Sequence, residues 1–195
     1  MHPQFVYNLS KYLHLMNKNA FIVTGLILAI ALINGCAQQT PNTPITNNSM
    51  KLTSLAFTNN ETIPAKYTCD GEDLSPPLAI SEVPPKVKSL ALIVDDPDAP
   101  AGDWVHWTLW NIKAETAAIE EDTVPQGATE GYTDFGKPGW GGPCPPSGIH
   151  HYQFKLYALD KVLDLPASAR KADLEKAMAE HTVASIVLVG LYQKK

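Results

Sequence analysis

Hydrophobic and polar residues alternate with a period of two in several short stretches after residue 50. Residues 152–159, YQFKLYAL, place every second side chain on one apolar face, which is the pattern of a half-buried strand. Two other runs, 89–95 and 185–191, are apolar nearly throughout and suit central strands of a sheet. Together these patterns predict strands over residues 51–58, 89–95, 105–112, 152–159 and 185–191.

Clusters of proline and glycine separate these stretches, and 15 of the 16 prolines follow residue 36. Because proline disrupts helix interiors and central strands, this spacing favours short strands joined by structured loops. One amphipathic helix is predicted over residues 169–181, with Ser168 as its N-cap and Leu174, Met178 and His181 on one stripe. We therefore predict a mainly β fold, an antiparallel sandwich with a short C-terminal helix.

The N-terminal segment has the pattern of a signal peptide. An apolar run of about 14 residues, 20–33, follows Lys18 and is shorter than the roughly 20 residues that span a bilayer. Its end, Ile-Asn-Gly-Cys at 33–36, resembles the lipobox of bacterial lipoproteins. That resemblance implies lipidation of Cys36 and a location on the periplasmic side of a bacterial membrane, with Ala37 favouring the outer membrane.

Two alternatives to lipidation stay open: an uncleaved anchor with an ordinary Cys36, and cleavage without lipidation. Translation from Met16 would give a more compact signal. Residues 37–50 are polar, contain two prolines and predict a flexible tether. The predicted organisation is therefore a signal peptide over 1–36, a tether over 37–50 and one domain over 51–195.

The predicted domain is acidic. The full chain has a net charge of −5; Lys11 and Lys18 precede Cys36, so the later residues hold 13 basic and 20 acidic side chains, a net charge of −7. That charge and the absence of a basic run argue against nucleic-acid binding. A bound anion would need a local site, because the overall field opposes it.

Two segments carry candidate chemistry. The first, DDPDAP at 95–100 with WVHW at 104–107, puts carboxylates in a proline-stiffened turn after a predicted strand. The second, GGPCPPSGIHHY at 141–152, is a glycine- and proline-rich loop that leads into the next strand. Glycine allows backbone N–H groups to approach a ligand closely, and successive N–H groups bind anions.

These segments resemble the two signature segments of the phosphatidylethanolamine-binding protein family, in particular its bacterial Raf kinase inhibitor-like branch. YTCDG at 67–71, LSPPL at 74–78 and YALD at 157–160 add to a resemblance that covers about residues 51–193. It implies a Greek-key β-sandwich with a pocket for phosphate-like anions. His151 stands where the family usually has arginine. The ligand-binding residues implied by the resemblance are Asp96, Asp98, Trp104, His106, Gly142, Pro143, His150 and Tyr152.

The residue types fit an anion site. His106 and His150 could donate N–H bonds to phosphate oxygens, most strongly when protonated, so we expect binding to weaken above neutral pH. Either carboxylate could orient an imidazole, although Asp98 could equally cap its turn. Trp107 and Trp110 are read as packing residues.

Cys69 and Cys144 form an even pair in a chain predicted to enter an oxidising compartment. A disulfide between them and two free thiols are both open, because the sequence does not give the distance between the two residues.

The sequence thus predicts a non-enzymatic protein that binds phosphate-bearing or other anionic small ligands, including phospholipid head groups, without a metal or cofactor. A hydrolase or metal-dependent enzyme that uses the same His and Asp cluster is the first alternative. An inhibitor of a protease or kinase, as in eukaryotic relatives of the family, is the second.

Overall fold

The computed structural model of this chain describes residues 50–195. The predicted signal peptide, Cys36 and residues 37–49 of the predicted tether lie outside the described residues. Met50, the last residue assigned to the tether, is buried in the core. No helix within residues 50–195 is both long and apolar enough to cross a membrane.

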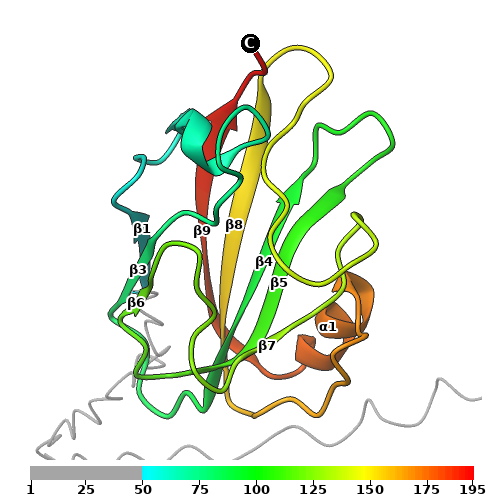
Figure 1. The fold of residues 1–195 in the computed structure, drawn as a ribbon. Coiled ribbons are helices and arrows are strands. Elements are labelled where there is room, and N and C mark those ends of the chain that lie inside the picture. Colours follow the sequence, from blue (N-terminus) through cyan, green and yellow to red (C-terminus); the bar gives the residue numbers. More distant parts are fainter. Residues whose placement is uncertain (1–49) are drawn as a thin grey trace, which may run out of the picture. The chain divides into compact units, whose positions relative to one another are not determined.

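The described part of the chain forms two sheets and one short α-helix, which confirms the mainly β prediction (Figure 1). The larger sheet has the strand order β2-β9-β8-β4-β5-β7, and the smaller one has the order β1-β3-β6. All pairings are antiparallel except β2 with β9, which run parallel. The elements are β1 Lys51–Ser54, β2 Glu61–Thr62, the 3-10 helix η1 Ala65–Tyr67, β3 Leu78–Ser81, β4 Ser89–Asp96, β5 Trp104–Lys113, β6 Ala118–Ile119, β7 Thr129–Glu130, β8 His150–Leu159, α1 Lys171–Met178 and β9 Thr182–Tyr192.

Two apolar clusters hold these elements together. The first lies between the sheets, where Leu52 and Ile80 of the small sheet join Trp107 and Phe154 of the large one. The second includes Trp110 and lies on the other face of the large sheet, where α1 packs. Each of the two tryptophans is 1% exposed, so their assignment to packing is confirmed. Burial on both faces explains why β4 is apolar along most of its length.

All five predicted strands are present, although the first ends at Ser54 rather than at residue 58. The prediction missed β2, β3, β6 and β7, which contain two to four residues each. Stretches so short give no measurable alternation, and their pairing depends on the neighbouring strand.

The helix is shorter than predicted, and its N-cap is Arg170 rather than Ser168. A turn before it, closed by the Ala169 N–H donating to the Pro166 carbonyl, delays the first helical residue. The Asp173 carboxylate accepts the backbone N–H of Arg170. His181 therefore follows the helix, and its ring is hydrogen-bonded to Asp160 instead of lying on a helical stripe.

Three strand ends meet at one end of the large sheet. β4 ends at Asp96, which pairs with Trp104 at the start of β5. Between β5 and β8 the chain passes through β6 and β7. β8 then pairs with the edge of β4 opposite β5. Both candidate segments of the sequence are therefore brought to the same end of the sandwich.

Candidate functional site

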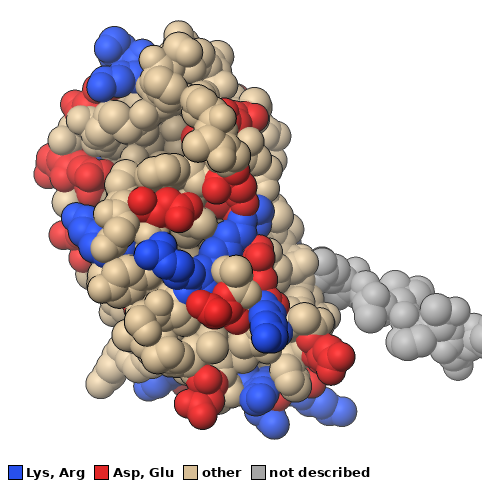
Figure 2. Space-filling view, turned by 90° about the vertical axis from the view of Figure 1, so that its right-hand side faces the viewer, with Lys and Arg blue, Asp and Glu red and all other residues tan. Residues whose placement is uncertain are grey.

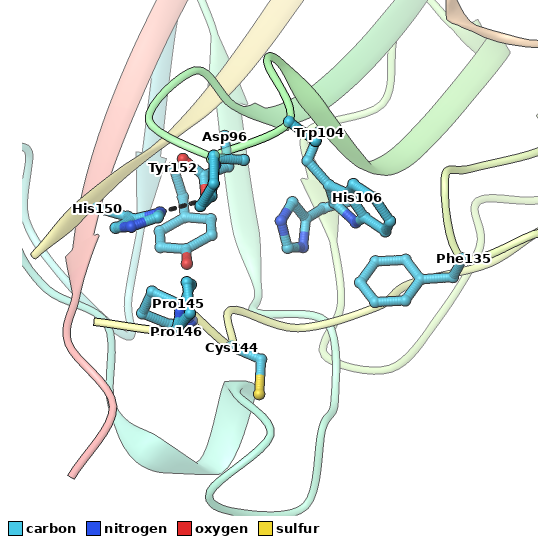
Figure 3. A pocket seen from close by; sticks show the side chains of 12 residues that line it. Asp96, Trp104, His106, Phe135, Cys144, Pro145, Pro146, His150 and Tyr152 are labelled. Carbon is cyan, nitrogen blue, oxygen red and sulfur yellow. Dashed lines mark hydrogen bonds and ion pairs between the residues drawn. The ribbon is translucent and has the colours of Figure 1, made fainter. Parts of the chain in front are cut away.

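A cavity of about 280 Å³ lies where these strand ends meet. Its polar lining comes from the end of β4 and the starts of β5 and β8, and the adjoining loops supply an apolar rim (Figure 3). His106 and His150, which come from two distant segments, line this one cavity, as the family resemblance implied. The complete lining is Asp96, Ala99, Pro100, Ala101, Trp104, His106, Phe135, Cys144, Pro145, Pro146, His150 and Tyr152.

A β-bulge directs His106 into the cavity. Val94 pairs with Trp107, but the next residue, Asp95, pairs with Val105, so His106 is an extra residue in β5. Strict alternation would send His106 and Trp107 to opposite faces of the sheet. Because of the bulge, His106 lines the cavity while Trp107 remains in the core between the sheets.

The ring of His106 is fixed by the glycine-rich loop. Its Nδ1 lies 2.5 Å from the Gly141 carbonyl oxygen, and the Gly141 N–H donates back to the His106 carbonyl. A carbonyl oxygen only accepts hydrogen bonds, so Nδ1 carries the proton and Nε2 is the ring nitrogen left for a ligand.

His150 is held in the same manner by a carboxylate. Its Nδ1 lies 2.7 Å from Oδ2 of Asp96, and both side chains are buried. The other carboxylate oxygen of Asp96 accepts the backbone N–H of Asp98 at 2.9 Å. This second bond fixes the carboxylate and the turn together. His150 therefore also keeps its Nε2 for the cavity.

Tyr152 follows on the same face of β8 as His150. Its hydroxyl is buried near the Asp96 carboxylate and the Cys144 backbone, and it makes no hydrogen bond of standard geometry within residues 50–195. Burial, reinforced by the negative charge of Asp96, raises the pKa of the Tyr152 phenol. The phenol stays protonated at any physiological pH and has one O–H donor unused.

Burial also governs the charge of His106. It lowers the pKa of this imidazole below the usual 6.5, and the Gly141 carbonyl and the Asp96 carboxylate only partly oppose it. His106 is therefore neutral at pH 7, with a lone pair on Nε2. The sequence-based expectation that both imidazoles donate to an anion needs this correction, since neutral His106 accepts at that nitrogen.

Three of the predicted ligand-binding residues do not line the cavity. Asp98 is exposed, and its carboxylate accepts the ring Nδ1 and the backbone N–H of His151 at 2.7 and 2.8 Å, so it fixes the turn. His151 lowers the pKa of Asp98 through these bonds. The N–H of Gly142 is not free, because it donates to Asp73, and the Pro143 carbonyl accepts the N–H of Cys69.

The apolar rim contains residues that the sequence reading missed. Phe135 comes from the loop after β7, and its ring packs edge-on against Trp104 and His106, with centroids 5.6 and 5.4 Å apart. No local pattern marks Phe135, because only the folded loop brings it over the cavity. Pro100 and Pro145 also line the rim, and both lie inside the segments already singled out.

A disulfide joins Cys69 to Cys144, whose Cα atoms are 5.4 Å apart. Of the two alternatives left open by the sequence, the structure has the bonded one. The bond connects the loop after η1 to the glycine- and proline-rich loop at the cavity. Within residues 50–195 there is no group of three or more His, Cys, Asp or Glu side chains placed to hold a metal ion.

Comparison with known proteins identifies relatives of the whole domain. A UPF0098 protein of the archaeon Methanothermobacter thermautotrophicus is 49% identical over 150 residues, which is 74% of this chain and 99% of that protein. The model of the family described as phosphatidylethanolamine-binding protein matches residues 53–193.

Solved structures agree with this assignment. A phosphatidylethanolamine-binding protein homolog from Chlamydia trachomatis superimposes with a TM-score of 0.73 at 41% identity, covering 76% of this chain and 99% of that one. E. coli YbcL, described as a member of the mammalian PEBP family, gives 0.71 at 33% identity, covering 75% of this chain and 99% of that one. Sequence and fold thus agree over nearly the whole described domain, and the chain belongs to the phosphatidylethanolamine-binding protein family.

Proposed function

We propose that this domain is a non-enzymatic binding protein for small phosphate-bearing or other anionic ligands, including phospholipid head groups, and that the cavity at the ends of β4, β5 and β8 is its site. One observation carries the proposal. Two imidazoles are held by their Nδ1 atoms on fixed acceptors, so that both offer Nε2 to one cavity beside the unpaired hydroxyl of Tyr152.

An anion in this cavity can be held without much rearrangement. A protonated His150 donates from Nε2 while its Nδ1–H stays on Asp96, and Tyr152 donates its free O–H. The surrounding Trp104, Phe135 and prolines give the cavity an apolar rim, and hydrogen bonds beside such low-polarity surroundings are stronger than in water. They also provide an apolar contact for whatever group carries the anion.

Because the domain is acidic, an anion must be attracted by groups inside the cavity and not by the overall charge of the protein. The net charge after Cys36 is −7, so the general field repels anions. Affinity must then depend on the few donors inside the cavity, and single substitutions there should have large effects.

Calorimetric titration with inorganic phosphate tests the proposal, using the wild-type protein, His150→Ala and His181→Ala. His181 is the matched control, because it also bonds a carboxylate through Nδ1 but lies outside the cavity lining. We expect His150→Ala to weaken phosphate binding by about 10- to 100-fold, which is the loss of one charge-assisted hydrogen bond, and His181→Ala to leave it unchanged.

Equal losses in both variants, or phosphate binding that survives in His150→Ala, would show that the site lies elsewhere. Release of inorganic phosphate when the protein is incubated separately with a phosphate ester would instead indicate an enzyme.

We also propose that the domain is held on the periplasmic side of a bacterial membrane, preferentially the outer one, by lipid on Cys36. The support is the lipobox-like end of the signal-peptide pattern at residues 33–36. Mass spectrometry of the mature protein should give an N-terminal lipidated cysteine, and Cys36→Ser should abolish it. A mature chain that retains residues 1–35 would rule the anchor out.

A further inference from the structure

We propose that a second groove, beside α1, binds small zwitterions, that is, amino acids and short peptides with a free amino and a free carboxyl terminus. The groove has a volume of about 350 Å³ and lies between the start of α1, the start of β5 and the loop after β7. It shares no lining residue with the cavity at the ends of β4, β5 and β8, so this inference does not depend on the proposed function. The complete lining is Asp103, Val105, Tyr132, Asp134, Arg170, Lys171, Ala172 and Glu175.

Neighbouring residues of the same segments line the two sites. At the start of β5, Trp104 lines the cavity and Asp103 lines the groove. In the loop after β7, Phe135 lines the cavity and Asp134 lines the groove. Because successive side chains of an extended chain point to opposite sides, one pair of segments forms two separate sites.

A buried carboxylate that the cavity does not use lies beneath the groove. Asp95 is the first acid of the DDPDAP segment, and its side chain is fully buried. It accepts hydrogen bonds from Lys155 and Lys171 at 2.7 and 2.6 Å. The Lys171 ammonium also contacts Asp103 and lies 3.7 Å from Glu175. The protein itself therefore neutralises Lys171, which in turn fixes the Asp103 carboxylate at the groove.

The groove also has a fixed positive charge whose contacts are neutral. The guanidinium of Arg170 lies over the ring of Tyr132, 5.7 Å from its centroid, and Nη1 donates to the Thr133 carbonyl at 3.3 Å. This bond uses one N–H donor of the guanidinium and leaves the others for a ligand. Nearby, the Asp134 carboxylate is held through Oδ2 by the backbone N–H of Val105 at 2.8 Å.

Charges of both signs are thus in place before a ligand arrives, which lowers the cost of binding. The carboxylate of a zwitterion can form a bidentate pair with Arg170, while its ammonium binds Asp134 or Glu175. A ligand with only one of the two charges satisfies only part of the groove. The volume is at the low end of the range of small-molecule sites, which suits a ligand of the size of a dipeptide.

Alanyl-alanine and its two blocked derivatives form a matched set of probes. The N-acetyl derivative has no ammonium group, and the C-terminal amide has no carboxylate. In ¹⁵N–¹H NMR titrations of the protein, we expect alanyl-alanine to shift backbone amides within 103–105, 132–134 and 170–175. Each blocked probe should bind about five- to ten-fold more weakly, which is the loss of one charge-assisted hydrogen bond at a partly exposed site. Blocked probes that bind as tightly as alanyl-alanine, shifts confined to other residues, or no shifts at millimolar concentration overturn the inference.

Charge-matched variants locate the two ends of the ligand. Arg170→Gln should weaken alanyl-alanine binding about five- to ten-fold and remove the difference between alanyl-alanine and its amide. Lys176→Gln, which removes the same charge from an exposed position of α1 outside the groove, should change neither. In the same way, Glu175→Gln should reduce the effect of N-acetylation, and Glu180→Gln should not. Equal losses in a variant and its control overturn the inference.

Titration with inorganic phosphate separates this inference from the proposed function. Arg170 lies outside the cavity lining, so Arg170→Gln should bind inorganic phosphate as the wild-type protein does. A protein that binds phosphate but not alanyl-alanine overturns the inference and leaves the proposed function standing. The reverse result overturns the proposed function and supports the second site.

Discussion

At the scale of single residues, Asp95 and Asp96 show how one strand serves two environments. Asp96 faces the cavity and fixes His150, whereas Asp95 faces the other side of the sheet and accepts hydrogen bonds from Lys155 and Lys171 at 2.7 and 2.6 Å. The sequence analysis placed this acidic pair in a candidate site, in a proline-stiffened turn after a predicted strand. Their partners could not be predicted, because they lie 54 to 76 positions away along the chain.

Replacement of Asp96 by alanine tests how much this residue contributes to the stability of the fold. The change leaves the buried Nδ1–H of His150 and the N–H of Asp98 without their acceptor. We expect Asp96→Ala to lower the free energy of unfolding by roughly 2–4 kcal/mol, measured by urea denaturation. Asp160→Ala is the control, since its contact with His181 is exposed and should change stability by less than about 1 kcal/mol. Similar values for the two variants would contradict the described role of Asp96.

At the scale of elements, the long strands were predictable, whereas the bulge in β5 and the placement of Phe135 over the cavity were not. Alternation located β4, β5, β8 and β9 because each is long enough to show a period. The bulge at His106 and the placement of Phe135 depend on cross-strand pairing and loop packing, which no local pattern encodes. Ion pairs also connect α1 to β4 and to the loop between β4 and β5, because Lys171 of α1 contacts both Asp95 and Asp103. Acidic and basic side chains are intermingled over the face of the molecule shown in Figure 2.

The disulfide gives a prediction for the loops. It closes a segment with a sequence separation of 75 residues. Chain-entropy arguments assign such a cross-link about 4 kcal/mol of stability, so the double variant Cys69→Ala/Cys144→Ala should lose approximately that amount in urea denaturation. Addition of a dithiol should destabilise the wild-type protein and leave the double variant unaffected. A wild-type transition that does not respond to reductant would mean that the bond adds nothing to stability.

At the scale of the whole molecule, an acidic domain is expected to hold its anion at one point, where two distant segments meet. The resemblance to the phosphatidylethanolamine-binding protein family, carried by the segments at 95–107 and 141–152, implied that residues 96, 106, 150 and 152 meet in one pocket. It could not assign the tautomer of His106 or the loss of the Gly142 donor to Asp73, since both depend on contacts between loops far apart in the chain.

The pH dependence of folding belongs to this scale. The pKa of His106 is lowered on folding, so the unfolded chain takes up a proton near pH 6.5 before the folded protein does. The contribution of neutral His106 to the free energy of unfolding should be complete above about pH 6.5, and it should decrease as the pH falls toward the pKa of His106 in the folded protein. Below about pH 4 a further loss is expected, because the pKa values of Asp70, Asp98 and Glu121 are lowered by their hydrogen-bond partners in the folded state.

Urea denaturation between pH 8 and pH 5 measures this slope. His106→Leu should flatten it, while His181→Leu should retain it. A slope that is unchanged in His106→Leu would show that His106 is not the group held neutral by folding. Ligand binding and folding are thus expected to respond to acid in opposite directions, since phosphate binding strengthens as stability declines.

The central claim is that His106 and His150 each keep a proton on Nδ1 and offer Nε2 to the same anion. Nitrogen NMR of the ¹⁵N-labelled imidazoles measures it most directly, in the free protein and during titration with inorganic phosphate. The account predicts that free His106 is the Nδ1–H tautomer and that phosphate shifts the Nε2 signals of His106 and His150 together, with His181 unmoved. A proton on Nε2 of free neutral His106, or phosphate shifts that spare either cavity imidazole, would contradict it.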